Sequence, residues 1–162
     1  MSICLTSLNP IMNSQDLYPY IESFVDLIID DEIGRNIAAT LSAEEHKLSV
    51  YYLTKTGKMR LCNDPKSFAP KGYSINETNS SIRIYIPIPD DGEEYSYVFL
   101  SVDNKFPHEI KAKYKISPQN ESNSQLLLTD NIKRNKIWWD NKLIWDSESD
   151  DSIINEIIKI KL

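Results

Sequence analysis

Residues 81–88 read Ser-Ile-Arg-Ile-Tyr-Ile-Pro-Ile, and every second residue of this segment is an isoleucine. The alternation has the period of two that a β-strand shows when one of its faces is buried and the other meets solvent. Pro87 and Pro89 cannot donate hydrogen bonds to a neighbouring strand, so they limit this strand to a sheet edge or a strand end. The segment therefore predicts a strand whose isoleucine face packs on a core.

The segments that follow predict more strands. Residues 95–102 are apolar and aromatic, and Asp90-Asp91-Gly92-Glu93 has the composition of a turn, so we expect 81–88 and 95–102 to pair as a hairpin. Residues 109–116 alternate apolar residues with three lysines, which predicts a solvated face or a protected edge. Further strands are predicted at 126–129 and at 136–145, which turns at Asp140-Asn141.

Upstream of residue 81 the pattern is mixed. Residues 47–54 and 58–62 alternate around Gly57 and predict a hairpin. Residues 17–30 repeat apolar side chains at spacings of three and four after a possible cap at Asp16, which predicts an amphipathic helix. Residues 35–46 suit a helix or a strand, and the pattern slightly favours a helix.

The C-terminal segment, residues 152–162, is also ambiguous. Ile153, Ile154, Ile157 and Ile158 have helical spacing, whereas residues 158, 160 and 162 alternate as in a strand, and a helix is favoured. Together these patterns predict an α+β fold with a mainly antiparallel sheet of about five to seven strands. We expect an N-terminal amphipathic helix, a C-terminal helix and a single domain over residues 1–162.

Composition places the chain among ordinary globular proteins. Its 162 residues are 41% hydrophobic and 26% charged, which suits one domain with its own core. Cys4 and Cys62 are far apart and have no metal-binding or redox spacing. The N-terminus lacks the pattern of a secretion signal, and no run of residues is apolar enough to span a membrane, so we expect a cytoplasmic protein.

Motifs for catalysis are missing from the sequence. His46 and His108 each stand outside any recognisable nucleophile, zinc or nuclease motif, and the four glycines are too scattered to form a phosphate-binding loop. Asp90-Asp91-Gly92-Glu93-Glu94 lacks the alternating ligands of a calcium loop. We therefore predict no catalytic residues, no cofactor and no metal site.

The acidic residues predict a binding function instead. The net charge is -6, and 14 of the 24 acids lie in residues 16–32, 90–94 and 146–151. Neighbouring residues of a strand face opposite ways, so Trp138 and Trp139 cannot both enter one core, and an exposed tryptophan could anchor an interface. The predicted partner-binding residues are Glu22, Asp26, Asp30, Asp90, Asp91, Glu93, Glu94, Trp138, Trp139, Trp145, Asp146, Glu148, Asp150 and Asp151.

These features favour an inhibitor or immunity protein that neutralises a basic toxin, such as a nuclease, by covering it with an acidic surface. The expected partner is a basic protein, and neither nucleic acid nor a membrane is expected to bind. A second hypothesis is a small enzyme that uses carboxylates with His46 or His108. A third hypothesis is an acidic scaffold or a mimic of nucleic acid, for which a net charge of -6 is modest.

Overall fold

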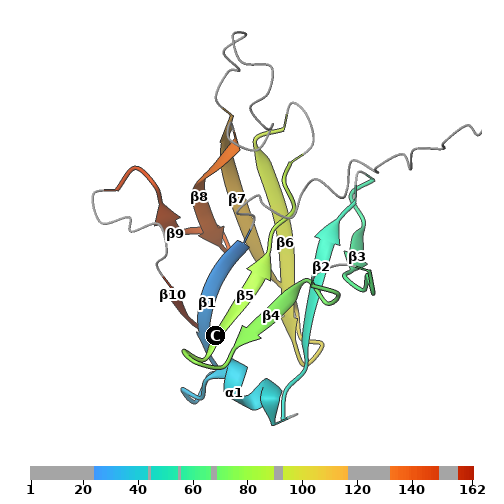
Figure 1. The fold of residues 1–162 in the computed structure, drawn as a ribbon, viewed down its shortest axis with the longest axis vertical. Helices are drawn as coiled ribbons and strands as arrows, with labels where there is room; N and C mark the ends of the chain where they lie inside the picture. The colour runs from blue at the N-terminus through green and yellow to red at the C-terminus, as the bar shows by residue number, and fades with distance from the viewer. Residues whose placement is uncertain are drawn as a thin grey trace, which may run out of the picture.

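The computed structural model describes residues 24–43, 45–54, 56–66, 69–89, 93–116, 132–149 and 157–162. Within these ranges the chain forms a four-stranded and a six-stranded β-sheet, which pack face to face as a β-sandwich (Figure 1). The strand order is β10-β1-β5-β4 in the first sheet and β3-β2-β6-β7-β8-β9 in the second. All described pairings are antiparallel except that of β1 with β10.

The strands are mostly short. The four-stranded sheet contains β1 (Phe24–Asp30), β4 (Tyr73–Asn76), β5 (Ser81–Tyr85) and β10 (Ile158–Lys161). The six-stranded sheet contains β2 (Leu48–Leu53), β3 (Met59–Leu61), β6 (Tyr95–Val102), β7 (His108–Ile116), β8 (Ile132–Trp139) and β9 (Lys142–Asp146).

A single short helix, α1 (Ile37–Ser42), lies at one end of the described sandwich (Figure 1). The side chain of Asn36 caps it by accepting a hydrogen bond from the N–H of Ala39, and the same side chain donates to the carbonyl of Ser80. Ile37 is fully buried. The helix favoured for residues 35–46 is confirmed in this shorter form, and no helix in the described ranges is long and apolar enough to cross a membrane.

The core lies between the two sheets. Strand β5 contributes Ile82 and Ile84, which are completely buried, and β1 contributes Val25, Leu27 and Ile29 beside them. The six-stranded sheet contributes the inward-facing residues of β2, β6, β7 and β8 to the same cluster, which are Leu48, Val50, Val98, Leu100, Val102, Ile110, Ala112, Tyr114, Ile137 and Trp139. The isoleucine face predicted at residues 82 and 84 is therefore the face that joins the layers.

The predicted α+β fold is wrong, because the described chain is mostly strand. In the described part of the expected N-terminal helix, residues 24–30 form β1, where buried and half-buried residues alternate. The same residues also have a period of two, and pairing with β5 on one side and β10 on the other satisfies their backbone groups. Residues 17–23 of the expected helix lie outside the described ranges.

The predicted C-terminal helix is also wrong where the structure describes it. Residues 158–161 form β10, which pairs in parallel with β1, and Leu162 N–H donates to the carbonyl of Asp30. The alternation of Ile158 and Ile160 decides the outcome, because both residues pack partly against the core. Residues 152–156 lie outside the description.

The expected hairpin between residues 81–88 and 95–102 does not form. Strand β5 pairs with β1 and β4, whereas β6 pairs with β2 and β7 in the other sheet. Strand β5 ends at Tyr85, and the buried Ile86 is followed by Pro87 and Pro89. Since these prolines cannot continue the ladder, the chain leaves one sheet and crosses to the other.

The other predicted strands are largely confirmed. Strands β2 and β3 form the hairpin expected around Gly57, and β8 and β9 form the one that turns at Asp140-Asn141. Strand β7 matches residues 109–116. Because it lies between β6 and β8, its lysines do not protect an edge, and the alternative prediction of a solvated face is confirmed, with Lys111 and Lys113 half-buried and Lys115 exposed. The strand expected at residues 126–129 falls outside the described residues.

Truncating Ile84 to alanine should lower the free energy of unfolding by about 2–5 kcal/mol, because it leaves a cavity where the two sheets meet. Urea unfolding followed by circular dichroism measures this loss. The matched control is Ile33→Ala, since Ile33 is 76% exposed and its truncation should cost less than about 0.5 kcal/mol. Equal losses in both variants would contradict this core.

Candidate binding face

A row of apolar and aromatic side chains crosses the outer face of the six-stranded sheet. The register pairs Leu53 with Met59, Tyr97 with Lys111, and Trp138 with both Lys111 and Leu143. Paired residues share a face, and this face is opposite to the one that buries Val98 and Ile110. We call this row the aromatic stripe, and its members are Met59, Leu53, Tyr97, Lys111, Trp138 and Leu143.

The aromatic stripe coincides with most of the exposed apolar surface. Six large hydrophobic residues are exposed within the described ranges, and four of them lie on this face: Leu53 at 43%, Met59 at 51%, Leu61 at 50% and Leu143 at 46%. The other two, Ile33 and Phe106, lie in turns. Exposed apolar residues gathered on one face of a folded protein are typical of an interaction site.

Lys111 orders the aromatic side chains at the centre of the face. Its ammonium lies 4.3 Å from the ring centre of Tyr95, 5.4 Å from that of Trp138 and 5.8 Å from that of Tyr97. The rings of Tyr95 and Trp138 also contact each other, with centres 6.2 Å apart. A cation held among three rings limits their rotamers, so the face presents a partly preorganised aromatic surface.

A row of charges runs beside the aromatic stripe, and we call it the charged row. Lys113 pairs with Glu94 at 3.3 Å, Lys136 pairs with Asp146 at 2.9 Å, and the two lysines are neighbours across β7 and β8. The hydrogen bond from each lysine to its carboxylate raises the pKa of that lysine. The N–H of Glu148 and then Lys136 lower the pKa of Asp146. The carboxylates in this row are therefore already paired.

The other described acids of the predicted binding site do not belong to the charged row. Asp26 faces Arg83 across β1 and β5 and forms two hydrogen bonds of 2.8 Å with it, on the four-stranded sheet. Asp30 ends β1 in that sheet, and Glu148 follows β9, where Asn135 contacts it at 3.4 Å. The structure thus brings Glu94, Trp138 and Asp146 to one face. Glu93 precedes β6, and the residues outside the description are Glu22, Asp90, Asp91, Asp150 and Asp151.

The two other predicted tryptophans do not share the face of Trp138. Trp139 points inward, is 8% exposed and stacks on His108 with ring centres 5.0 Å apart. Trp145 pairs with the inward-facing Ile137 and is half-buried under the guanidinium of Arg134. The opposite orientation predicted for Trp138 and Trp139 is therefore confirmed.

Charge is divided unevenly along the chain. The described residues contain 17 lysines and arginines but only 14 aspartates and glutamates, although the whole chain has 18 and 24. Ten of the acids and one of the bases thus lie outside the described ranges. The described sandwich is slightly cationic, and the acidity of the chain belongs mainly to segments outside the description.

His46 is part of a clamp between β2 and β6. Asp103, in a turn with a positive φ of 53°, contacts His46 Nδ1 through Oδ2 at 2.5 Å and accepts the N–H of Lys47 through Oδ1 at 2.8 Å. The N–H of Asp103 in turn donates to the carbonyl of Lys47. The N–H of Lys47 and then His46 lower the pKa of Asp103. This carboxylate therefore holds the start of β2 to the end of β6.

His108 is part of an equivalent clamp between β7 and β8. Asp140, with a φ of 45°, contacts His108 Nδ1 at 2.6 Å and accepts the N–H of Glu109 at 2.8 Å. The N–H of Asp140 donates to the carbonyl of Glu109, as in the first clamp. Each aspartate precedes an asparagine, and both residues of each pair have a positive φ, as the two central residues of a type I′ turn do. Both histidines therefore take part in strand pairing.

Sequence reasoning missed most members of the aromatic stripe. The signal was present, because Tyr95, Tyr97 and Phe99 alternate with the buried Ser96, Val98 and Leu100 along β6. The lysines of β7 alternate in the same way. What the alternation could not give is the neighbour order of β6, β7 and β8, which places Lys111 between Tyr97 and Trp138.

Comparison with known proteins gives no relative for this chain: no family model matches it, and neither the curated proteins nor the solved structures include a significant match. The candidate face therefore rests on the residues and geometry described above.

Asp103→Asn should lower stability near neutral pH and remove part of the acid sensitivity of the fold. Because the folded-state pKa of Asp103 lies below its ordinary value, its contribution is complete above about pH 5 and is lost as the pH falls through that lowered pKa. Urea midpoints measured from about pH 6 to about pH 3 should converge for the variant and the unmodified chain. A constant difference between the two would contradict this role. The control is Asp64→Asn, because the described hydrogen bond of the Asp64 carboxylate is a local one, from the N–H of Lys66.

Proposed function

We propose that the chain is a binding protein of the inhibitor type and that it docks a partner protein on the outer face of the six-stranded sheet. The observation that carries the proposal is the aromatic stripe, in which exposed leucines and a methionine continue a tyrosine, a lysine and a tryptophan across all six strands. Tyrosine, tryptophan and methionine are enriched in protein interfaces, and aromatic residues are frequent hot spots.

The size of the face fits a protein partner. Six strands give five spacings of about 4.8 Å, so the aromatic stripe is about 24 Å long. A standard interface covers about 800 Å² on each partner, which corresponds to a width of about 28 Å. Because Lys111 restricts the rings of Tyr95, Tyr97 and Trp138 before binding, less conformational entropy would be lost on docking.

The charges on this face favour a partner with carboxylates around an apolar patch. Five lysines project from β7 and β8 on the outer side, whereas Glu94, Glu109 and Asp146 are the acids beside them. Because Lys113 and Lys136 are paired with carboxylates, the excess positive charge is carried by Lys111, Lys115 and Lys133. The lysines on this face are Lys111, Lys113, Lys115, Lys133 and Lys136.

This proposal retains the inhibitor class of the immunity-protein hypothesis, but it places the docking surface on the aromatic stripe instead of on the acidic residues. A basic toxin remains the predicted partner of the acidic segments, of which residues 16–23, 90–92 and 150–151 lie outside the described ranges. The aromatic stripe offers a contact that does not depend on those acids. An inhibitor that uses both surfaces would attract a partner electrostatically and anchor it through aromatic contacts.

Replacing both Leu53 and Leu143 with glutamate should abolish partner binding, because it puts charge on the aromatic stripe without entering the core. Co-purification from the organism that encodes the chain, followed by cross-linking and mass spectrometry, identifies the bound protein and the residues it contacts. Calorimetry should then show an affinity at least about 30-fold weaker for the variant, equivalent to about 2 kcal/mol.

The matched control carries Ile33→Glu and Phe106→Glu, which place the same charge at two exposed apolar positions away from the face. This control should bind as the unmodified chain does. A partner lost by the control and kept by the double leucine variant would refute the proposed surface. Urea midpoints of the two variants establish that both are folded.

A further inference from the structure

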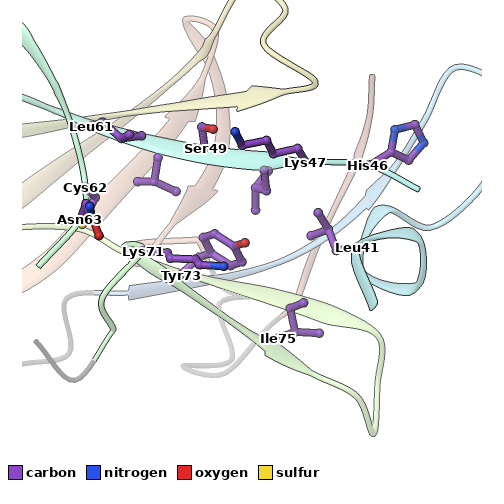
Figure 2. A pocket seen from close by; sticks show the side chains of 12 residues that line it. Leu41, His46, Lys47, Ser49, Leu61, Cys62, Asn63, Lys71, Tyr73 and Ile75 are labelled. Atoms are coloured by element: carbon purple, nitrogen blue, oxygen red, sulfur yellow. The ribbon is translucent and has the colours of Figure 1, made fainter. Parts of the chain in front are cut away.

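A groove opens along one side of the sandwich, between β2 of the six-stranded sheet and β4 of the four-stranded sheet. Its volume is about 550 Å³, and its apolar lining includes Leu41, Leu48, Val50, Tyr73 and Ile75. Figure 2 shows Tyr73 and Ile75 on β4 opposite β2, with Leu41 of α1 at one end and Cys62 and Asn63 at the other. The groove reaches the outer face of the six-stranded sheet at Leu61, but no member of the aromatic stripe lines it.

Strand β4 is an edge strand, and its outward backbone groups border this groove. The carbonyl of Gly72 accepts the N–H of Tyr85, so Gly72 belongs to a hydrogen-bonded pair with β5. Backbone groups alternate in direction along an antiparallel pair, so Ser74 and Asn76 also face β5. The N–H and C=O groups of Tyr73 and Ile75 therefore point away from the sheet, which gives four groups able to pair with an added strand.

The opposite wall of the groove is β2, and part of β2 also lacks a neighbouring strand among the described residues. Val50 accepts the N–H of Cys62, so the even-numbered residues of β2 face β3. Leu48 faces the same way, but the chain has already turned aside, because Asp64 N–H donates to the carbonyl of Pro70. The described chain thus leaves the first residues of β2, from Leu48, without a neighbouring strand on this side. The core residues Leu48 and Val50 line the groove.

The polar lining of the groove is cationic or neutral. Lys47 and Lys71 contribute ammonium groups, and His46, Ser49, Cys62 and Asn63 complete the polar part of the lining. None of the described residues that line the groove carries a carboxylate, although Asp103 holds His46 from outside it. An occupant with a carboxylate would therefore be electrostatically favoured over one with an added cation.

We propose that the groove binds an extended segment of a partner protein, which adds to β4 as a fifth strand of the four-stranded sheet. Its alternate apolar side chains enter the groove beside Tyr73 and Ile75, and a carboxylate on the same face of the segment pairs with Lys71 or Lys47. Strand addition supplies affinity through backbone hydrogen bonds and specificity through alternate side chains. This site is independent of docking on the aromatic stripe.

The probe is the synthetic peptide acetyl-Thr-Val-Thr-Val-Thr-Asp-Thr-amide, which puts two valines and the aspartate on one face. A second peptide has lysine in place of aspartate. The full-length chain carries Cys4→Ser, so that Cys62, a half-buried free thiol in the groove, is the only cysteine that can be alkylated. At a peptide concentration ten times Kd, occupancy should slow the alkylation of Cys62 about tenfold.

Hydrogen exchange and N-methylated peptides test whether binding occurs by strand pairing. The acidic peptide should slow exchange at the amides of Tyr73 and Ile75, which should exchange rapidly in its absence. Two further peptides carry N-methyl groups on alternate residues, one on the odd and one on the even positions. Because alternate amides of a paired strand face the partner strand, one of them should bind and the other should not.

Charge reversal tests the carboxylate contact. Lys71→Glu should weaken the acidic peptide about tenfold and should reverse the preference between the acidic and the lysine peptide. The matched control is Lys66→Glu in the same loop region, because Lys66 is exposed and does not line the groove. The control should retain the original preference.

Four results would overturn the proposal. They are no protection of Cys62 by the acidic peptide, equal behaviour of the two N-methylated peptides, no effect of Lys71→Glu, and amides of Tyr73 and Ile75 that are already protected without peptide. The last result would mean that another part of the chain or a second copy covers β4. If the first result is accompanied by a change in the fluorescence of Trp138, the peptide binds on the aromatic stripe instead.

Discussion

The packing of β1 and β5 against the inner face of the six-stranded sheet is the constraint on which the rest of the structure depends. Val25, Leu27, Ile82 and Ile84 form the inner layer of the smaller sheet, and β1 is held on both sides by β5 and β10. The hydrophobic effect drives these isoleucine-rich faces together, while pairing satisfies their backbone groups. Once the inner faces are buried in this way, the alternation of each strand assigns every other residue to the outside.

Because the outer face of the six-stranded sheet is not needed for the core, its composition indicates whether the protein has a binding surface there. A two-layer sandwich needs only its inner faces to be apolar, so polar residues would suffice on the outside. Instead, five of the six strands contribute an aromatic or aliphatic residue to the aromatic stripe, and the sixth, β7, contributes Lys111, which is held among three rings. The paired charges of Glu94, Lys113, Lys136 and Asp146 lie along one side, as a polar rim does in many interfaces. The proposed binding function depends on this excess of apolar surface.

A sandwich is open along the sides where its sheets have edge strands, and one such side here contains β2, β3 and β4. Strand β3 has only three residues, so the described chain leaves the start of β2 without a neighbour on that side. Strand β4 is short and forms one edge of the four-stranded sheet. Short edge strands are a common protection against uncontrolled pairing. The groove between β2 and β4 nevertheless retains outward backbone groups beside an apolar wall, and it is a second surface on which the fold could receive another chain.

Local alternation was enough to predict β2, β3, β5, β7 and the hairpin of β8 and β9, because strand periodicity and turn residues are local properties. It failed at residues 24–30 and 158–161, where the apolar positions fit both periods. There the strand is selected by core packing and by pairing between distant segments, such as that of β1 with β10, more than 100 residues apart. The sequence thus determined which residues of most strands share a face, along with the charge and the turns. Apart from the hairpins of β2 with β3 and of β8 with β9, the tertiary structure alone decided which strands are neighbours, because the rest of the order depends on contacts between distant segments. The aromatic stripe, the charged row and the groove all arise from that order.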